Sequence, residues 1–393
     1  MIKLEHTKVK TIEVYEDDKS GLCANSLQIS ARSHVALTPD KMINQTEVGY
    51  KYYSKEHLPN FDYPHKQVVA CPELTPKRLR KMQDGNYFNQ FQKNIKRIFN
   101  QTGDKIRIFS PKWRQEHRVL LQEDNMLIVG AGAFANADIV GLPVHKINAK
   151  AEAIAKSMSR IRELAERHGY QLTIAPAFSI KTTPRQLTDN IKAVHNEGFK
   201  IINIDNGGYL ASWINNYPRY LALSGLKLEG FYTFGTGTPR RWRVNKITSQ
   251  AHLLTLMGQD SLAIEVQKPF APDDDGDSNP LQRKVSELYR LNAEELGYDT
   301  IREHIRKHGN ELVCKSNCPM CNGEDGLIKA YRKSNKAGIN PVVNNIHDAY
   351  ESLWGMNDLR EGVITGDLTE RIKKRNALQR AVTTLFGQKR LGL

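Results

Sequence analysis

The stretch QLTIAPAFSIKTTPRQLTDNIKAVHNEGFKIINID, residues 171–205, decides the fold class. Its two ends, QLTIAPAF and KIINID, are apolar runs typical of buried strands. Between them, PRQLTDNIKAVHNEG starts with proline and has apolar residues at helical spacing. Strand, helix and strand in this order predict a parallel βα unit, because parallel strands need a crossover connection. The expected fold class is therefore α/β.

The same alternation continues on both sides of this stretch. Buried strands are expected at 126–134 (MLIVGAGAF), 137–144 (ADIVGLPV), 228–235 (LEGFYTFG) and 261–266 (SLAIEV), and helices at 149–168 and 246–257. Gly169 follows the first of these helices, where a C-terminal cap is expected. The number of units suffices for a (β/α)8 TIM barrel, whose functional residues lie at the carboxyl ends of its strands. An open doubly wound sheet is the alternative.

Three regions differ in texture. Residues 1–120 are polar and irregular, include a helix expected over 75–99, and can contribute the first barrel elements. Residues 121–281 carry the main βα units, and residues 282–393 form a mainly helical region with a cysteine cluster and a basic tail. The loop at 272–280 is not expected to bind calcium. Ser278 stands where a calcium loop needs glycine, and Lys284 stands where it needs glutamate.

The chain is strongly basic. Lys and Arg number 57 and Asp and Glu 43, which gives a net charge of +14. Such an excess favours a polyanionic partner, because each phosphate contact releases condensed counterions. Residues 371–393 include seven basic and no acidic residues, so this tail is expected to face phosphate or to form a solvated helix face. The absence of a long apolar run and of a signal-peptide pattern predicts a cytoplasmic protein without membrane contact.

A cluster of cysteines is the strongest chemical signal. Cys314, Cys318 and Cys321 lie within eight residues, and His347 follows in the segment NNIHDAY. Three thiolates and one imidazole complete a tetrahedral zinc shell with no position left for water. The sequence therefore predicts a structural Zn²⁺ site.

A rival motif occurs in MLIVGAGAF. Gly130, Gly132 and Ala135 fit the spacing of a dinucleotide-binding fingerprint, with Glu152 twenty residues beyond Gly132. The fingerprint needs a helix directly after it, but the strand ADIVGLPV is expected there. This interpretation is therefore the weaker one.

The zinc motif resembles that of the guanine transglycosylases that act on tRNA. Twenty-five residues separate Cys321 from His347, as in that family, although three residues rather than one lie between the first two cysteines. Ala155-Lys-Ser-Met158 and the segment after His347 are similar to two helices of the family. The resemblance implies an interrupted TIM barrel with a C-terminal helical zinc-binding subdomain. It also implies exchange of guanine in a polynucleotide for a 7-deazaguanine base, through a covalent link between an Asp and the nucleotide.

The resemblance also implies site residues. Asp260, in the element Asp-Ser-Leu-Ala, matches the nucleophile of the family, and this element favours DNA over tRNA as the substrate. Asp205 is the candidate second carboxylate for proton transfer. Both are expected at strand ends that meet at the mouth of the barrel. The candidate substrate-binding residues are Gly207, Gly208, Gly235, Gly237, Arg240 and Arg241.

The sequence also departs from the family. The tRNA enzymes have Asp-Ser-Gly-Gly-Phe where this chain has Gly130-Ala-Gly-Ala-Phe134, and the base-recognising Asp expected after Asp138-Ile-Val140 is missing. These departures keep a second hypothesis open, a non-catalytic zinc-containing paralogue or targeting subunit that binds nucleic acid. The oligomeric state is also open, and a homodimer is one candidate.

Overall fold

The computed structural model describes most of the chain. The described residues are 6–17, 22–54, 63–113, 120–144, 150–207, 213–226, 230–239, 241–244, 246–265, 289–308, 314–322 and 341–386. The loop at 272–280, and with it the question of calcium binding there, lies outside these residues.

Eight parallel strands close into one barrel, and they follow one another around it in chain order. They are β4 (Asp40–Asn44), β5 (Gln67–Ala70), β7 (Ile106–Phe109), β9 (Ile139–Pro143), β10 (Thr173–Ser179), β11 (Ile201–Asp205), β12 (Tyr232–Thr238) and β15 (Ser261–Ile264). The last strand closes on the first, with Ser261 opposite Asp40. The βα barrel is confirmed and the open sheet is wrong. Three of its strands lie before residue 121.

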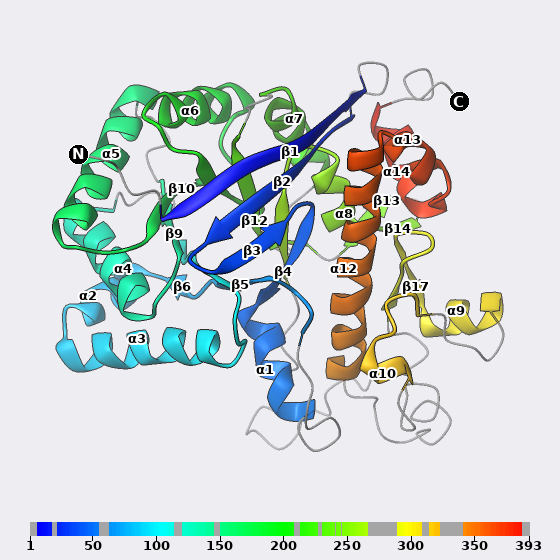
Figure 1. Cartoon of the computed structure of the whole chain (residues 1–393), viewed down its shortest axis with the longest axis horizontal. Coiled ribbons are helices and arrows are strands. Elements are labelled where there is room, and N and C mark those ends of the chain that lie inside the picture. The colour runs from blue at the N-terminus through cyan, green and yellow to red at the C-terminus, as the bar shows by residue number, and fades with distance from the viewer. Residues whose placement is uncertain are drawn as a thin grey trace.

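Helices cover the outside of the barrel (Figure 1). They are α1 (Gln45–Ser54), α2 (Pro76–Met82), α3 (Gly85–Asn100), α4 (Gln122–Phe134), α5 (Ala151–Arg167), α6 (Pro184–Asn196), α7 (Trp213–Ser224) and α8 (Gln250–Thr255). The helix expected over 149–168 is confirmed as α5, and Gly169 follows it in the left-handed conformation with φ +71°. The helix expected over 75–99 is two helices, because Asp84 caps a new helix start.

The strand expected at 126–134 is wrong, because this segment belongs to helix α4. Asp124 accepts a hydrogen bond from the backbone N–H of Leu121 and so fixes the start of the helix. A Cβ atom on Gly132 would lie 2.5 Å from Cγ2 of Val140, so the small residues let α4 pack closely against β9. The dinucleotide fingerprint fails for the same reason, since its glycines lie within a helix and not in a strand-to-helix turn.

The helix expected over 246–257 is shorter than the sequence indicated. Residues 246–249 form strand β14 (Lys246–Ser249), which pairs with β13 (Arg241–Val244), and α8 starts only at Gln250. These two strands join β16 (Tyr289–Asn292) and β17 (Gly297–Thr300) in a four-stranded sheet. Two of its strands, β13 and β14, come from the segment between barrel strands β12 and β15, and β16 contacts the cysteine cluster through Leu291 and His347.

A second small sheet covers the amino end of the barrel. It consists of β1 (Thr7–Asp17), β2 (Leu22–Ala31) and β3 (His34–Leu37), and Figure 1 shows it across the barrel strands. Apolar side chains of this sheet pack into one cluster with the side chains that fill the barrel: Leu27, Ile29, Ala36, Met42, Val69, Ile108, Ile139, Tyr232 and Phe234. The barrel is therefore closed by protein at its amino end.

The C-terminal region adds helices to the four-stranded sheet. They are α9 (Ile301–His308), α10 (Pro319–Asn322), α12 (Pro341–Thr365), α13 (Leu368–Lys373) and α14 (Asn376–Phe386). The long helix α12 runs from the cysteine cluster alongside β1, β2 and β4. Among the described residues, no helix has the length and apolar character needed to cross a membrane.

Candidate metal centre and candidate active site

Four potential metal ligands gather at the start of α12. Their ligand atoms, the Sγ atoms of Cys314, Cys318 and Cys321 and one ring nitrogen of His347, all lie within 4.8 Å of one another. Nδ1 of His347 lies 3.4 Å from Sγ of Cys318 and 3.3 Å from Sγ of Cys321. Three thiols and one imidazole at this spacing can hold one tetrahedral metal ion, which confirms the predicted metal-binding cluster.

Neighbouring groups orient these ligands. Nε2 of His347 lies 3.1 Å from the carbonyl oxygen of Leu291, which leaves Nδ1 facing the thiols. Nη2 of Arg290 donates to Sγ of Cys321 over 3.0 Å. Hydrogen bonds from Cys314 and Cys318, together with the charge of Arg290, lower the pKa of Cys321 to about 3. A thiolate, the form that binds metal, is therefore favoured at Cys321.

Two acids on α12 fix the segments that carry the ligands. Oε1 of Glu351 accepts hydrogen bonds of 2.8 Å from both the backbone N–H and the hydroxyl of Ser316. Oδ1 of Asp348 accepts one of 2.9 Å from the backbone N–H of Leu291. Sequence reasoning missed both acids, although they follow His347 by one and four positions and so lie on the same helix.

A group of ionisable side chains lies at the opposite end of the barrel from the β1–β3 sheet. Cys71 follows β5, Lys112 belongs to the short strand β8 (Lys112–Trp113) after β7, Asp205 ends β11, and Glu265 follows β15. We call these four residues the carboxyl-end cluster. Nζ of Lys112 lies 3.2 Å from Oε1 of Glu265. All four interact electrostatically, so the closure of the barrel has brought together residues from four strands.

The charges of this cluster follow from its surroundings. Burial lowers the pKa of Lys112, but its electrostatic interactions with Cys71, Glu265 and Asp205 and its hydrogen bond to Glu265 raise it above its ordinary value. Burial raises the pKa of the Cys71 thiol to about 12. At neutral pH Lys112 is therefore a cation, whereas Cys71 is a neutral thiol and a poor nucleophile.

Asp205 lies where the sequence predicted, at the carboxyl end of its strand. Its Oδ1 accepts a 3.0 Å hydrogen bond from the backbone N–H of Gly207, which has φ +78°. Two residues earlier on β11, inside the barrel, Nδ2 of Asn203 donates to the hydroxyl oxygens of Ser110 (2.7 Å) and Thr236 (3.1 Å). A buried polar layer thus lies beneath the cluster.

The expectation that Asp260 stands at the barrel mouth is wrong. Asp260 precedes β15, and its backbone N–H donates to the carbonyl oxygen of Thr233 at the start of β12. Oδ2 of Asp260 accepts a 2.7 Å hydrogen bond from the N–H of Thr233, and the residue is only 2% exposed. Burial raises its pKa to about 8. Asp260 therefore lies at the amino end, protonated at neutral pH, a position that argues against the predicted role of nucleophile.

The predicted substrate-binding residues have mixed positions. A Cβ atom on Gly235 would lie 2.3 Å from Oε1 of Gln259 and 2.7 Å from Nδ2 of Asn206, so this glycine makes room for the protein's own amide pair. Gly237 lies one residue before the end of β12 and has φ +62°. Gly208 and Arg240 lie outside the described residues, and the backbone of Arg241 belongs to β13.

Sequence reasoning missed Glu265 and Lys112. Glu265 was part of the expected strand SLAIEV, and the signal it offered is its place directly after the apolar run of the last barrel strand. Lys112 offered no comparable signal, because the strands around it are only two and four residues long.

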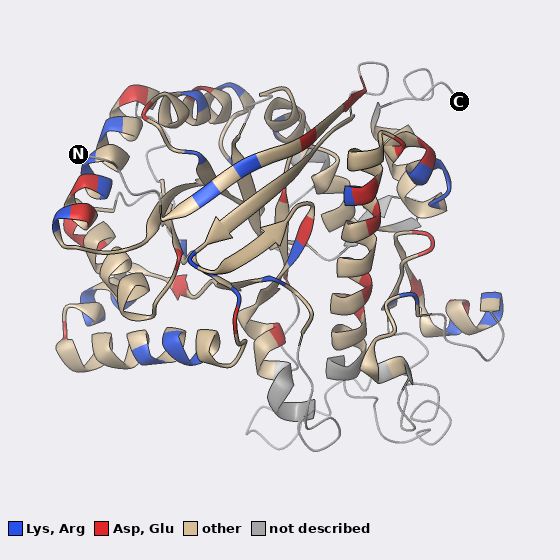
Figure 2. Ribbon diagram, viewed as in Figure 1, with Lys and Arg blue, Asp and Glu red and all other residues tan. Residues whose placement is uncertain are grey.

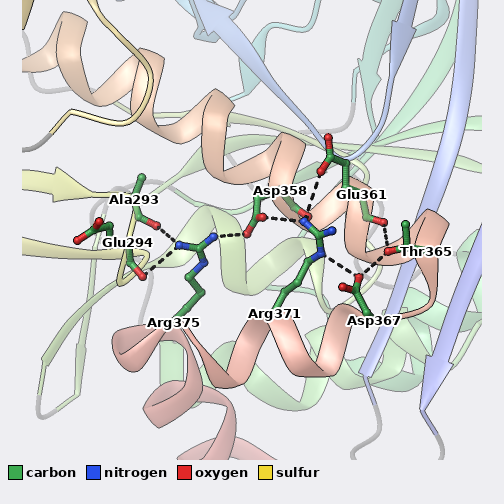
Figure 3. Close-up of polar contacts among 8 residues, drawn as sticks. All are labelled: Ala293, Glu294, Asp358, Glu361, Thr365, Asp367, Arg371 and Arg375. Atoms are coloured by element: carbon green, nitrogen blue, oxygen red, sulfur yellow. Dashed lines mark hydrogen bonds and ion pairs between the residues drawn. The ribbon is translucent and has the colours of Figure 1, made fainter.

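The cations at the start of the basic tail have acidic partners. Basic residues occur on α13 as well as on α2 and α3 (Figure 2). Arg371 forms ion pairs with Asp358 (2.9 Å) and Asp367 (2.8 Å), and Arg375 forms one with Asp358 (2.7 Å), as Figure 3 shows. Both arginines thus pair with Asp358 of α12, and the expectation that the basic tail faces phosphate stays a prediction.

Two comparisons with known proteins gave no relative. No protein-family model matches the sequence, and no curated protein is significantly similar to it.

Proposed function

We propose that this chain is a transglycosylase that exchanges guanine in a polynucleotide for a 7-deazaguanine base, and that its chemistry takes place at the carboxyl-end cluster. One observation carries the proposal: Asp205 and Glu265, from β11 and β15, interact with the same cation, Lys112, at the carboxyl end of a closed βα barrel. This end of a barrel is where enzymes of this architecture carry their catalytic residues.

In this proposal the nucleophile is Glu265, which replaces the earlier candidate Asp260. A carboxylate is needed, and Oε1 of Glu265 lies 3.2 Å from Nζ of Lys112, with which it forms an ion pair. An oxygen of Glu265 bonds to C1′ of the nucleotide while the bond from C1′ to N9 of guanine breaks, with its electron pair going to N9. Asp205, which takes up a proton when the polynucleotide binds, gives that proton to the departing base.

The second half of the reaction reverses the first. Asp205, now a carboxylate, takes the proton from N9 of the incoming base, N9 bonds to C1′, and the bond between C1′ and Glu265 breaks. Two carboxyl groups that divide nucleophilic and acid–base work at an anomeric carbon follow the logic of retaining glycosidases. The basic chain and the zinc-motif resemblance support a polynucleotide, DNA or tRNA, and a 7-deazaguanine as the substrates.

The metal of the Cys314–Cys318–Cys321–His347 cluster is proposed to be a structural Zn²⁺. All four positions of a tetrahedral shell are protein ligands, and imidazole with thiolates suits zinc. Elemental analysis of the purified protein should give one zinc per chain, and Cys318→Ser should lower both the zinc content and the thermal stability. A wild-type preparation that folds without any metal would contradict this proposal.

The function is tested by incorporation of labelled guanine or 7-deazaguanine into DNA oligonucleotides and tRNA. Wild type should incorporate label into one of them, and Glu265→Gln should incorporate none while it still folds and holds zinc. Asp260→Asn is the matched control, a carboxamide for a carboxylate at the other end of the same strand, and should keep the activity. Full activity of Glu265→Gln would overturn the assignment. Binding without exchange by wild type would favour the non-catalytic paralogue.

A further inference from the structure

Helix α2 presents four cations on one short segment. Its apolar residues, Pro76, Leu79 and Met82, are buried, and Thr75 caps its start through a hydrogen bond to the N–H of Arg78. The remaining residues with long side chains are all exposed and basic: Lys77, Arg78, Arg80 and Lys81. The apolar residues thus anchor the helix, and its entire polar surface is positively charged.

This helix is connected directly to the candidate active site. The strand before it, β6 (Glu73–Leu74), pairs in parallel with β8, and Glu73 is opposite Lys112. Lys112 in turn contacts Glu265. The cations of α2 therefore lie on the segment that continues β5 beyond the carboxyl end of the barrel.

The cations of α2 are not paired with acids as Arg371 of α13 and Arg375 after it are. Within the described parts of the chain, none of the four forms an ion pair with a carboxylate, whereas Arg371 and Arg375 contact Asp358. Arg78 donates to the backbone carbonyl of Glu73, and Nζ of Lys81 lies 5.7 Å from the ring centre of Tyr87. Four exposed positive charges without paired acids form a surface that attracts an anion.

We propose that α2 binds the phosphate backbone of the polynucleotide whose base reacts at the carboxyl-end cluster, an inference that rests on the proposed function. Arginine and lysine are the residues that contact phosphate oxygens in such complexes and fix the position of the strand. An anionic membrane is a poorer occupant, because membrane-binding helices insert an apolar face and the apolar residues of α2 are buried in the protein.

The test compares two fourfold variants that remove the same number of positive charges. One changes Lys77, Arg78, Arg80 and Lys81 of α2 to Ala. The control changes exposed cations of the outer helices α5 and α6 to Ala: Lys156, Arg160, Arg167 and Lys192. For the full chain, affinity for fluorescent single-stranded and double-stranded DNA oligonucleotides is measured at several salt concentrations between about 50 and 300 mM. The unfolding temperature of each variant checks that it folds.

The α2 variant should lose at least about tenfold in affinity, and the slope of log affinity against log salt should become shallower by about 2 to 4, since each phosphate contact contributes about 0.9. In the control variant, neither the affinity nor the salt slope should change by more than about a third of the change seen in the α2 variant. Equal losses in both variants, or unchanged binding by the α2 variant, would overturn the proposal. So would α2-dependent binding to anionic phospholipid vesicles without binding to DNA or tRNA.

Failure of the proposed function gives a different result. If the chain does not exchange bases, wild type still binds the oligonucleotide and the α2 variant still loses affinity, while no labelled base is incorporated. If only the α2 inference fails, wild type incorporates the base and both fourfold variants bind DNA as wild type does.

Discussion

Polar side chains at the two ends of the barrel have different surroundings. At the amino end, Nε2 of Gln67 donates to both Asp40 and Ser261, the hydroxyl of Tyr232 donates to Oε1 of Gln67, and all four residues are buried. At the carboxyl end, Lys112 and Glu265 form an ion pair and remain partly exposed, at 13% and 25%. Burial favours the neutral form of a carboxyl group, whereas a neighbouring cation favours the charged form. The amino end therefore holds buried, hydrogen-bonded polar groups, whereas the carboxyl end holds a partly exposed ion pair.

This difference explains why position in a strand decides the role of an acid. Asp260 and Glu265 stand five residues apart, on either side of β15. Asp260 satisfies the N–H of Thr233 and has its pKa raised to about 8 by burial, so it stabilises the start of the strand as a neutral group. Glu265 lies beyond the other end, next to a cation. The proposed nucleophile therefore stands beyond the carboxyl end of β15, and the buried acid stands before its amino end.

Asp205→Asn tests the difference between the two ends with the largest expected effect, a loss of activity without a loss of stability. Loss of a proton-transfer group should slow base exchange by about 10²- to 10⁴-fold. Stability should hardly change, because an amide oxygen can still accept the hydrogen bond from the N–H of Gly207. Single-turnover incorporation of labelled base and urea unfolding measure the two effects. A variant that lost stability in proportion to activity would show that Asp205 is structural, as the amino-end acids are.

Gly141→Ala should give the next largest effect, on the polar layer beneath the cluster. A Cβ atom there would lie 2.1 Å from Oγ and 2.7 Å from Cβ of Ser110, the serine that accepts a hydrogen bond from Asn203. Overpacking of this kind should cost about 3 kcal/mol of unfolding free energy. Ser110→Gly in the same chain removes both clashing atoms and should restore most of the loss. Failure of this rescue, measured by urea unfolding, would show that the strain lies elsewhere.

The sequence predicted the βα repeat and the metal centre well, and for a common reason. A strand–helix–strand pattern and three cysteines within eight residues are both local, so neighbouring residues contain the information. The predictions failed where the local signal was ambiguous. The run MLIVGAGAF fits a buried strand or a buried helix, and only its close packing against Val140 decides for the helix. Strands of four residues, such as β5 and β7, are too short to stand out in a polar region.

The candidate active site was the least predictable part. Lys112 and Glu265 are 153 positions apart, and only the closure of the barrel makes them neighbours. Asp205 could be placed at the carboxyl end because it follows an apolar run directly, which marks the end of a strand. Asp260 comes directly before an apolar run, so it stands at the amino end of that strand, whereas Glu265 comes directly after the run and stands at the carboxyl end. Which side of the apolar run an acid occupies therefore decides the end of the barrel at which it lies.

The pH dependence of the unfolding free energy tests whether Asp260 is protonated at the amino end. The expected difference between Asp260→Asn and wild type is close to zero in acid. Burial raises the pKa of Asp260 from 3.8 to about 8. Between these values the folded chain keeps a proton that the unfolded chain has lost, so its contribution to stability is complete below pH 4 and is lost as the pH rises towards 8. Asp260→Asn imitates the protonated form and should match wild type in urea unfolding at pH 4, then become the more stable of the two as the pH rises. Asp40, whose pKa burial raises to about 6, titrates in both chains and cancels in the difference. Parallel pH profiles would show that Asp260 is ionised in the folded protein, and the contrast between the two ends would then lose its electrostatic basis.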